Sequence, residues 1–373
     1  MSDQISKFLQ ERIDAGDFPS AVYIVAERGE IVLHDALGYA VVEPEQIEAK
    51  IDTIYDLASL TKVLVTGLVI AKLIETGEIQ LDARVSIYLK EFDTEGKRMI
   101  TVADLLTHIS RLPAWKPLYL LVSDPTKAID EIGRTHLDFG QETVSYSDLN
   151  FIALGSVIER FAGKSLDETA SENIFSRLGL NDTFFDPPRN VRPRIAASEK
   201  GNAYEKQICL EQGYLQPPAT AGGSDALRPH LIWGQVHDGN AFYMGGVAGH
   251  AGLFSTAEEV FNIAQQFLPN YTTLLKPETC QLFRTNFTKG LNEDRSFAFQ
   301  LASTPDSTAG SRMSPESFGH LGFTGTSLWI DPVKERIFIL LTNRTHNHAL
   351  PFANINAVRR KIHDLAIEIL EKN

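Results

Sequence analysis

Cysteine is almost absent from this chain, which has two among 373 residues, Cys209 and Cys280. Neither lies in a Cys-x-x-Cys pattern, so the chain is not a disulfide scaffold and two unpaired thiols are expected. Long apolar runs are also missing, since none reaches the roughly 18 residues that a membrane-spanning helix needs. The ten histidines include no His-Glu-x-x-His spacing, so no metal site is expected.

Basic residues are in deficit, with 35 Lys and Arg against 48 Asp and Glu and a formal net charge of −13. This balance argues against nucleic acid or an anionic membrane surface as the main partner. Residues 1–7 lack the basic and apolar regions of a signal peptide, so we expect a cytoplasmic location. The hydrophobic fraction of 43% is that of a globular protein, and the length suits one large domain or two.

The central feature of the sequence is the tetrapeptide Ser59-Leu60-Thr61-Lys62, which opens an apolar stretch with helical spacing, residues 60–75. Ser59 stands where we expect a helix to begin, and Lys62 follows close to one turn later. The unpaired N–H groups of a helix start favour a developing negative charge. A serine becomes a nucleophile when a base takes its proton, so the pair is a candidate nucleophile and proton shuttle. A helix-capping serine beside an ordinary lysine is the alternative.

Strand patterns occur at both ends of the chain, and helical patterns fill the middle. Strands are expected at residues 21–26, 31–40, 296–303, 327–330 and 336–342. Helices are expected at residues 4–14, 60–75, 101–108, 125–136, 147–163, 166–178, 258–267 and 351–371.

These patterns predict an α+β fold, an α/β sandwich in which one antiparallel sheet built from both chain ends is flanked by helices. A mostly helical lobe is inserted into it. We expect residues 1–58 and 242–373 to form the sheet domain and residues 59–241 the helical lobe with long loops. The active site is expected between the two. Within the lobe, residues 181–241 read as mainly loop.

Two later stretches offer the base and the oxyanion hole that a nucleophile needs. Tyr146 precedes an expected helix and can relay a proton if a nearby cation lowers its pKa; a packed tyrosine behind a helix capped by Ser147 or Asp148 is the alternative. Residues 318–329 contain three glycines just before a strand, which allows a ligand to approach the backbone closely. The Phe323 N–H is therefore a candidate oxyanion donor, with a bulged strand as the alternative.

In this order the three stretches resemble the serine β-lactamase and penicillin-binding protein superfamily. The resemblance is closest to the class C β-lactamase-like serine hydrolases, which include family VIII carboxylesterases and D-amino-acid peptidases. Residues 59–62 are similar to the Ser-x-x-Lys motif, and residues 146–148 lie where this family has Tyr-x-Asn. Residues 320–322 lie where β-lactamases have Lys-Thr-Gly and many relatives have His-x-Gly. The similarity extends over nearly the whole chain.

The resemblance implies a β-lactamase/transpeptidase-like fold and an acyl-enzyme mechanism that uses no cofactor and no metal. Ser59 would attack a carbonyl, while Lys62 and Tyr146 would accept and return its proton. The N–H groups of Ser59 and Phe323 would hold the oxyanion. Further residues implied in the substrate site are Asp148, His320 and Gly322. Aromatic candidates for an acyl pocket are Trp115, Tyr119, Tyr243 and Phe323.

Two departures from the family pattern bear on the chemistry. Asp148 stands where an asparagine is usual, and a carboxylate near Lys62 raises the pKa of that lysine, which shifts the role of base toward Tyr146. A competing alignment reads residues 147–149 as a broken Ser-Asp-Asn motif. His320 replaces the lysine of the third motif, and losing that fixed charge weakens the case for a substrate carboxylate.

The leading functional prediction is a carboxylesterase that acts on small esters or related acyl compounds. A β-lactamase or a D-Ala-D-Ala peptidase is the alternative within the same mechanism. A penicillin-binding or acyl-binding sensor with little turnover is the alternative from another class. The expected partner is a small-molecule ester, amide or β-lactam; neither nucleic acid nor a membrane is expected, and the oligomeric state is left open.

Overall fold

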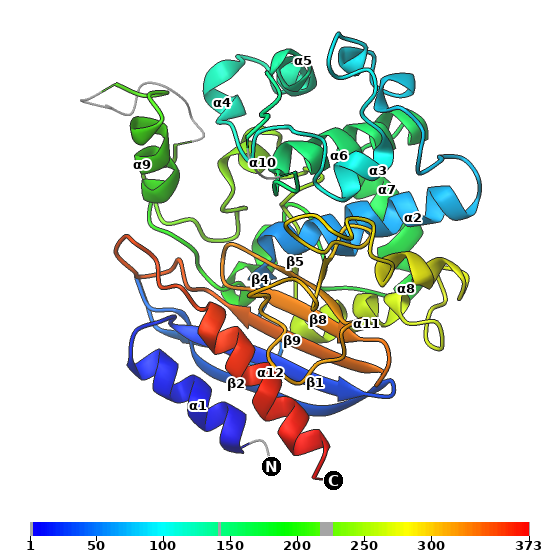
Figure 1. Ribbon diagram of the computed structural model, residues 1–373. Coiled ribbons are helices and arrows are strands. Elements are labelled where there is room, and N and C mark those ends of the chain that lie inside the picture. Colours follow the sequence, from blue (N-terminus) through cyan, green and yellow to red (C-terminus); the bar gives the residue numbers. More distant parts are fainter. Residues whose placement is uncertain (1–2, 141–142, 217–226, 373) are drawn as a thin grey trace.

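The protein is described by a computed structural model that covers residues 3–140, 143–216 and 227–372. Its main element is a seven-stranded antiparallel sheet in the order β3-β2-β1-β9-β8-β7-β6 (Figure 1). The N-terminal strands are β1 (Ser20–Glu27), β2 (Glu30–Val41) and β3 (Ile47–Glu48). The C-terminal strands are β6 (Gln300–Leu301), β7 (Phe318–Leu321), β8 (Ser327–Asp331) and β9 (Arg336–Thr342). Because β1 pairs with β9, both chain ends form one sheet, and the predicted α+β fold is confirmed.

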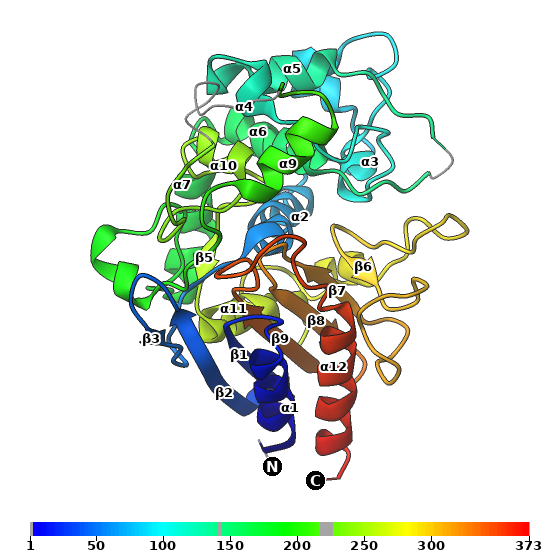
Figure 2. The same ribbon diagram turned by 90° about the vertical axis from the view of Figure 1, so that its left-hand side faces the viewer.

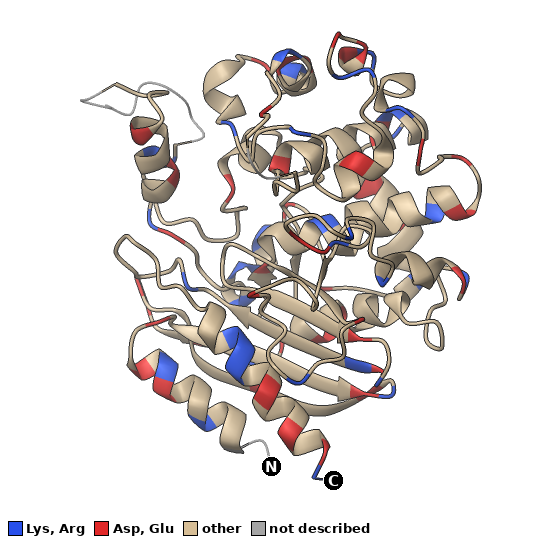
Figure 3. Ribbon diagram, viewed as in Figure 1, with Lys and Arg blue, Asp and Glu red and all other residues tan. Residues whose placement is uncertain are grey.

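Alternation along the strands gives the sheet two apolar faces. Tyr23 and Val25 point into a core shared with α1 (Asp3–Asp14) and α12 (Asn356–Leu370). These two terminal helices lie side by side on one face (Figure 2). Val22 and Ile24 point into the larger core, which includes α11 (Ala257–Ala264). The charged residues of β1, β8 and β9 stand at the strand ends, so the middle of these three strands is free of charge (Figure 3).

Helices other than α11 dominate the chain between the two sets of strands, and most of them lie above the sheet in Figure 1. They are α2 (Leu68–Glu75), α3 (Val102–Leu106), α4 (Leu118–Leu121), α5 (Ala128–Arg134), α6 (Asp148–Ala162), α7 (Leu166–Ala170), α8 (Ser176–Leu178), α9 (Ala203–Glu211) and α10 (Gly239–Tyr243). None of the helices in the described residues is long and apolar enough to cross a membrane. The division into domains at residues 58 and 241 stays a prediction.

The strand predicted at residues 296–303 is wrong for most of its length, because only Gln300–Leu301 pairs, with β7. Ala298 has a left-handed backbone with φ of +68°, which turns the chain. The flanking Phe297 and Phe299 are buried in a cluster with Phe283, at ring-centroid distances of 5.7 and 5.9 Å. The apolar alternation here therefore reflects aromatic packing rather than strand pairing.

The predicted loop at residues 181–241 also contains a helix that the sequence pattern did not indicate, α9. Glu205 and Cys209 are its buried residues, so the helix has no broad apolar stripe to reveal it. Residues 217–226 of that predicted loop lie outside the described residues. Cys209 and Cys280 are both buried and unpaired, as expected.

Candidate active site

Ser59 lies at an irregular joint between the sheet and α2. The strand β4 (Tyr55–Asp56) pairs with β5 (Phe254–Ser255) and leads into a 3₁₀ turn, Ala58–Leu60. Ala58 has a left-handed φ of +48°, and the Asp56 carboxylate accepts a hydrogen bond from its N–H at 2.9 Å. A π-helical turn, Lys62–Gly67, follows before α2 begins. The predicted helix start is thus a strained corner that projects Ser59, rather than a serine-capped end.

Lys62 is fully buried, and its ammonium group has three partners. Nζ donates to Ser59 Oγ at 2.8 Å and to the His250 carbonyl at 3.0 Å, and it forms an ion pair with Asp148 Oδ1 at 2.8 Å. Burial alone would lower the pKa of Lys62, but the carboxylate of Asp148 and the hydroxyl of Tyr146 outweigh it and the pKa is raised. The resting lysine is therefore a cation, as Asp148 led us to expect.

Tyr146 completes this cluster immediately before α6. Its ring centroid lies 5.1 Å from Lys62 Nζ, and its side chain is close enough to Lys62 and Ser59 for both to lower its pKa. Burial raises the pKa of Tyr146 and Asp148 adds to the increase, while Lys62 lowers the pKa without reversing it. Both candidate bases are thus protonated at rest. Asp148 Oδ1 lies on the same ammonium, so the structure brings all four predicted side chains together.

The third predicted motif ends β7 on the other side of Ser59. His320 Nδ1 lies 2.9 Å from the Leu321 carbonyl, while its Nε2 is buried and has no partner among the described residues. Burial, with the charges of Lys62 and Arg295, lowers the pKa of His320 well below its usual range, so the ring is neutral. A β-carbon at Gly322 would lie 2.6 Å from the Leu57 carbonyl. Glycine there lets the end of β7 lie directly against the Ser59 segment.

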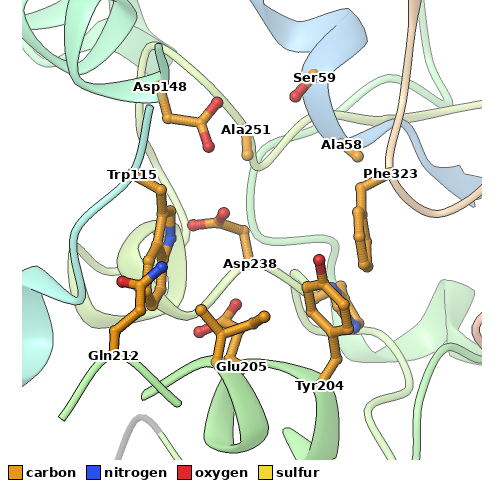
Figure 4. Close-up of a pocket in the computed structure, with 12 residues that line it drawn as sticks. Ala58, Ser59, Trp115, Asp148, Tyr204, Glu205, Gln212, Asp238, Ala251 and Phe323 are labelled. Carbon is orange, nitrogen blue, oxygen red and sulfur yellow. The ribbon is translucent and has the colours of Figure 1, made fainter. Parts of the chain in front are cut away.

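Two cavities open on Ser59, and Asp148 and Phe323 line both of them. The acidic cavity, of about 310 Å³, has aromatic walls and carboxylates that converge on its centre (Figure 4). Its lining residues are Ala58, Ser59, Trp115, Asp148, Tyr204, Glu205, Ile208, Gln212, His237, Asp238, Ala251 and Phe323. The arginine cavity, of about 360 Å³, is lined by Ser59, Tyr146, Asp148, Arg295, Gln300, His320, Leu321, Gly322, Phe323, Arg344 and Arg359.

Of the four aromatic candidates for an acyl pocket, Trp115 and Phe323 line the acidic cavity. Tyr119 instead donates from its buried hydroxyl to Glu205 Oε2 at 2.8 Å, and Tyr243 donates to the Val122 carbonyl at 2.7 Å. Neither tyrosine is among the lining residues of the two cavities.

Apart from Asp148, sequence reasoning missed the charged residues that line the two cavities. Glu205 of the acidic cavity has a pKa raised by burial to about 7. In the arginine cavity, the buried Arg295 pairs with Glu293 at 2.9 Å and lies over the Tyr146 ring, but its Nε and Nη1 have no hydrogen-bond partner among the described residues. The burial of Arg359 could have been predicted, because Arg359 lies on the face of the predicted C-terminal helix that also carries Ile362 and His363. Nothing in the local sequence marks Arg295, which reaches the site from a turn.

No group of three or more His, Cys, Asp or Glu side chains in the described part of the chain could hold a metal ion. The site instead offers a serine hydroxyl bonded to a buried ammonium group, a tyrosine within the same network, and a cavity on each side. These are the functional groups that a serine hydrolase uses to form an acyl-enzyme.

The comparisons with known proteins agree with that class. The sequence profile of the Beta-lactamase family matches residues 5–360, and the chain belongs to this family of serine hydrolases. It is 32% identical to the "Putative D-alanyl-D-alanine carboxypeptidase" of Escherichia coli K12 over 92% of this chain and 82% of the relative. The protein of the same name from Salmonella typhimurium LT2 is also 32% identical, over 94% of this chain and 84% of its own.

Solved structures show the same fold at lower identity. The hydrolase EstCE1, described as having promiscuous acyltransferase activity, superimposes with a TM-score of 0.74 at 20% identity and covers 98% of both chains. A class C β-lactamase from Rhodobacter sphaeroides gives a TM-score of 0.72 at 19% identity over 99% of both chains. The β-lactamase/transpeptidase-like fold inferred from the resemblance is therefore confirmed.

Proposed function

We propose that this protein is a serine carboxypeptidase-type hydrolase that cleaves an amide or ester whose leaving group carries a free carboxylate. The observation that carries the proposal is the arginine cavity, where two guanidinium nitrogens of the buried Arg295 have no hydrogen-bond partner among the described residues. A buried guanidinium with spare donors suits a carboxylate. The curated relatives named as D-alanyl-D-alanine carboxypeptidases support the same choice.

In the proposed mechanism, Ser59 Oγ attacks the substrate carbonyl and forms a C–O bond. Its proton passes into the Lys62–Tyr146 pair, one member of which must first be deprotonated, since both are protonated at rest. The N–H groups of Ser59 and Phe323 would stabilise the oxyanion. The bond to the leaving group then breaks, and the leaving amine takes a proton from the pair. Water attacks the acyl-enzyme with the same groups acting in reverse.

This proposal reorders the sequence-based preference for a carboxylesterase, which stays a prediction. The argument for an ester was that His320 replaces a lysine. In the structure, Arg295 and Arg359 line the same cavity as the neutral His320, so this cavity holds positive charge after all. The apolar walls of the acidic cavity, including Trp115 and Ile208, keep a simple ester as the second candidate.

The test compares three substrates: an acylated D-Ala-D-Ala peptide, the same peptide with a C-terminal amide, and a short p-nitrophenyl ester. Ser59→Ala should abolish turnover of all three. Arg295→Met should lower kcat/KM for the free-carboxylate peptide about 10- to 100-fold, the worth of a hydrogen bond to a charged group. It should leave the amide and the ester nearly unchanged.

The matched control is Arg160→Met, because Arg160 is a surface arginine paired with Glu91, outside the two cavities. Faster cleavage of the ester than of the peptide, with no selectivity in the Arg295 variant, would restore the carboxylesterase as first choice. Acylation of Ser59 by all three, with one equivalent of leaving group released and no hydrolysis of the acyl-enzyme, would favour the sensor module.

A further inference from the structure

Two buried threonine hydroxyls join the turn after β7 to the segment that precedes Ser59. Thr324 Oγ1 donates to the Asp56 carbonyl at 2.7 Å, and Thr326 Oγ1 donates to the Leu57 carbonyl at 2.9 Å. Each bond spans more than 260 residues of sequence, so neither is local to a helix or a turn. The turn carries Phe323, and the other segment leads directly into Ser59.

The turn is fixed from behind as well. Gly322 N–H donates to the Thr326 carbonyl at 2.8 Å, which closes the turn. Arg359 Nη2 donates to the carbonyls of Gly322 and Thr326 at 3.1 and 2.9 Å, and Arg344 Nε donates to the Phe323 carbonyl at 2.7 Å. The two arginines thus hold the carbonyls of Gly322, Phe323 and Thr326, while the two threonine hydroxyls bond the turn to the segment before Ser59.

The Ser59 segment in turn depends on Asp56. One oxygen of the buried Asp56 carboxylate accepts from Ala58 N–H at 2.9 Å, and the other accepts from His237 N–H at 2.7 Å. The first of these bonds holds the left-handed Ala58 that orients the backbone of Ser59. Displacing the backbone of Asp56 or Leu57 would therefore rotate the Ser59 N–H.

We propose that Thr324 and Thr326 are positioning residues that fix the two halves of the oxyanion hole, the N–H groups of Ser59 and Phe323, relative to each other. This inference rests on the proposed function, in which those two groups bind the oxyanion. The two donors come from chain segments far apart in sequence, and their separation must match one oxygen atom. Donors held in place before the reaction need no reorganisation as the charge develops.

The experiment measures the rate constant for phosphonylation of Ser59 by an alkyl fluorophosphonate. In this reaction an O–P bond forms at Ser59, the P–F bond breaks, fluoride leaves, and the serine proton passes into the Lys62–Tyr146 pair. The rate of this reaction depends on the geometry of the oxyanion hole, and measuring it does not require the natural substrate. The variants are Thr324→Val, Thr326→Val and the double substitution, with Thr→Ser at each position to restore the hydroxyl.

Each valine variant should react about 100-fold more slowly, the effect of misplacing reacting groups by about 1 Å. The double variant should be slower by less than the product of the single effects, because both hydroxyls hold one turn. The serine variants should recover most of the rate. With a hydrolysed substrate, the loss should fall on kcat while KM stays close to wild type.

Thr169→Val is the control, since Thr169 is a buried threonine in α7 whose hydroxyl donates to the Ser165 carbonyl at 2.9 Å. Melting temperatures establish that the variants are folded, and Thr→Ala at both positions replaces valine if the β-branched side chain prevents folding. Wild-type labelling rates in the folded valine or alanine variants would overturn the proposal, as would serine variants that stay slow.

Failure of the proposed function gives a different result. Wild-type protein that is labelled at Ser59 but leaves the D-Ala-D-Ala peptide intact would contradict the carboxypeptidase assignment. The labelling rates of the threonine variants would still test whether Thr324 and Thr326 position the oxyanion hole. Wild-type protein that is not labelled at Ser59 would overturn both.

Discussion

At the scale of single residues, the decisive arrangement is a fully buried lysine that shares its ammonium group among Ser59, Asp148 and a backbone carbonyl. A buried ammonium without a partner would lose its proton. Asp148 prevents this and keeps the pKa of Lys62 raised. The unusual aspartate therefore makes the proton harder to remove, and activity should depend on the pH at which the Lys62–Tyr146 pair loses it.

Replacing Asp148 by asparagine should shift the acidic limb of the kcat/KM pH profile to lower pH. The carboxylate raises the pKa of Lys62, so removing its charge lowers that pKa and exposes the base at lower pH. An opposite charge this close shifts a pKa by about 1 to 3 units, so a displacement of about one pH unit or more is expected.

Asp130→Asn is the matched control, because Asp130 pairs with Lys127 at 3.5 Å away from the lining of both cavities. A limb that stays in place or moves to higher pH in Asp148→Asn would show that another group holds the proton.

At the scale of elements, the site depends on how closely the end of β7 lies against the corner after β4. Gly322 makes this approach possible, because a β-carbon there would overlap Thr326 Oγ1 and press on the Leu57 carbonyl. The two elements belong to different sheets, so the contact is tertiary. Glycine at position 322 is therefore required by this close packing, which the sequence motif alone did not reveal.

Gly322→Ala should lower both stability and activity. The methyl group would push β7 from the Ser59 segment, and overpacking of this kind costs about 1–3 kcal/mol of unfolding free energy. A displacement of about 1 Å at the oxyanion hole should lower kcat/KM about 100-fold. Chemical denaturation and steady-state kinetics measure the two effects.

Gly140→Ala provides the comparison, since its nearest neighbour beyond the adjacent residues would be the Asp138 side chain at 3.3 Å on an exposed loop. Near-wild-type behaviour of both variants would mean that β7 and the Ser59 corner tolerate separation.

At the scale of the whole molecule, several histidines are buried in neutral form. Burial lowers the pKa of His34, His108, His320 and His346, and it lowers that of His363 to about 4. His237 opposes them, because Glu199 raises its pKa despite burial. In the unfolded chain a histidine titrates near 6.5, so below that pH the unfolded state binds more protons than the folded state.

These neutral histidines should therefore lower the free energy of unfolding as the pH falls from 7 to 5, while Glu205, whose pKa burial raises to about 7, acts in the opposite direction. For His363, with a pKa of about 4 in the folded state, the loss at pH 5 is about 2 kcal/mol. Denaturant titrations at the two pH values measure the change, and His363→Gln should lose less stability between them by about that amount. The same pH-dependent change in the wild-type protein and in His363→Gln would contradict the contribution of His363.

The sequence by itself determined the elements whose signal is local. Repeating apolar positions located β1, β2, β8, β9, α6 and α12, and the Thr101 capping box located α3. The resemblance of three ordered motifs likewise sufficed for the family, and it implied Ser59, Lys62, Tyr146 and Asp148 as one candidate cluster. Local chemistry also gave the correct direction for Lys62, since an adjacent carboxylate raises the pKa of an ammonium group wherever the two meet.

Only the tertiary structure decided what surrounds that cluster. Arg295 lies just before the residues that local alternation presented as a strand, and Glu205 lies on a helix that local pattern did not indicate; each lines a cavity that opens on Ser59. The bonds from Thr324 and Thr326 join segments more than 260 residues apart. Charge around a nucleophile is set by which distant segments pack beside it, and sequence periodicity carries no information about that packing.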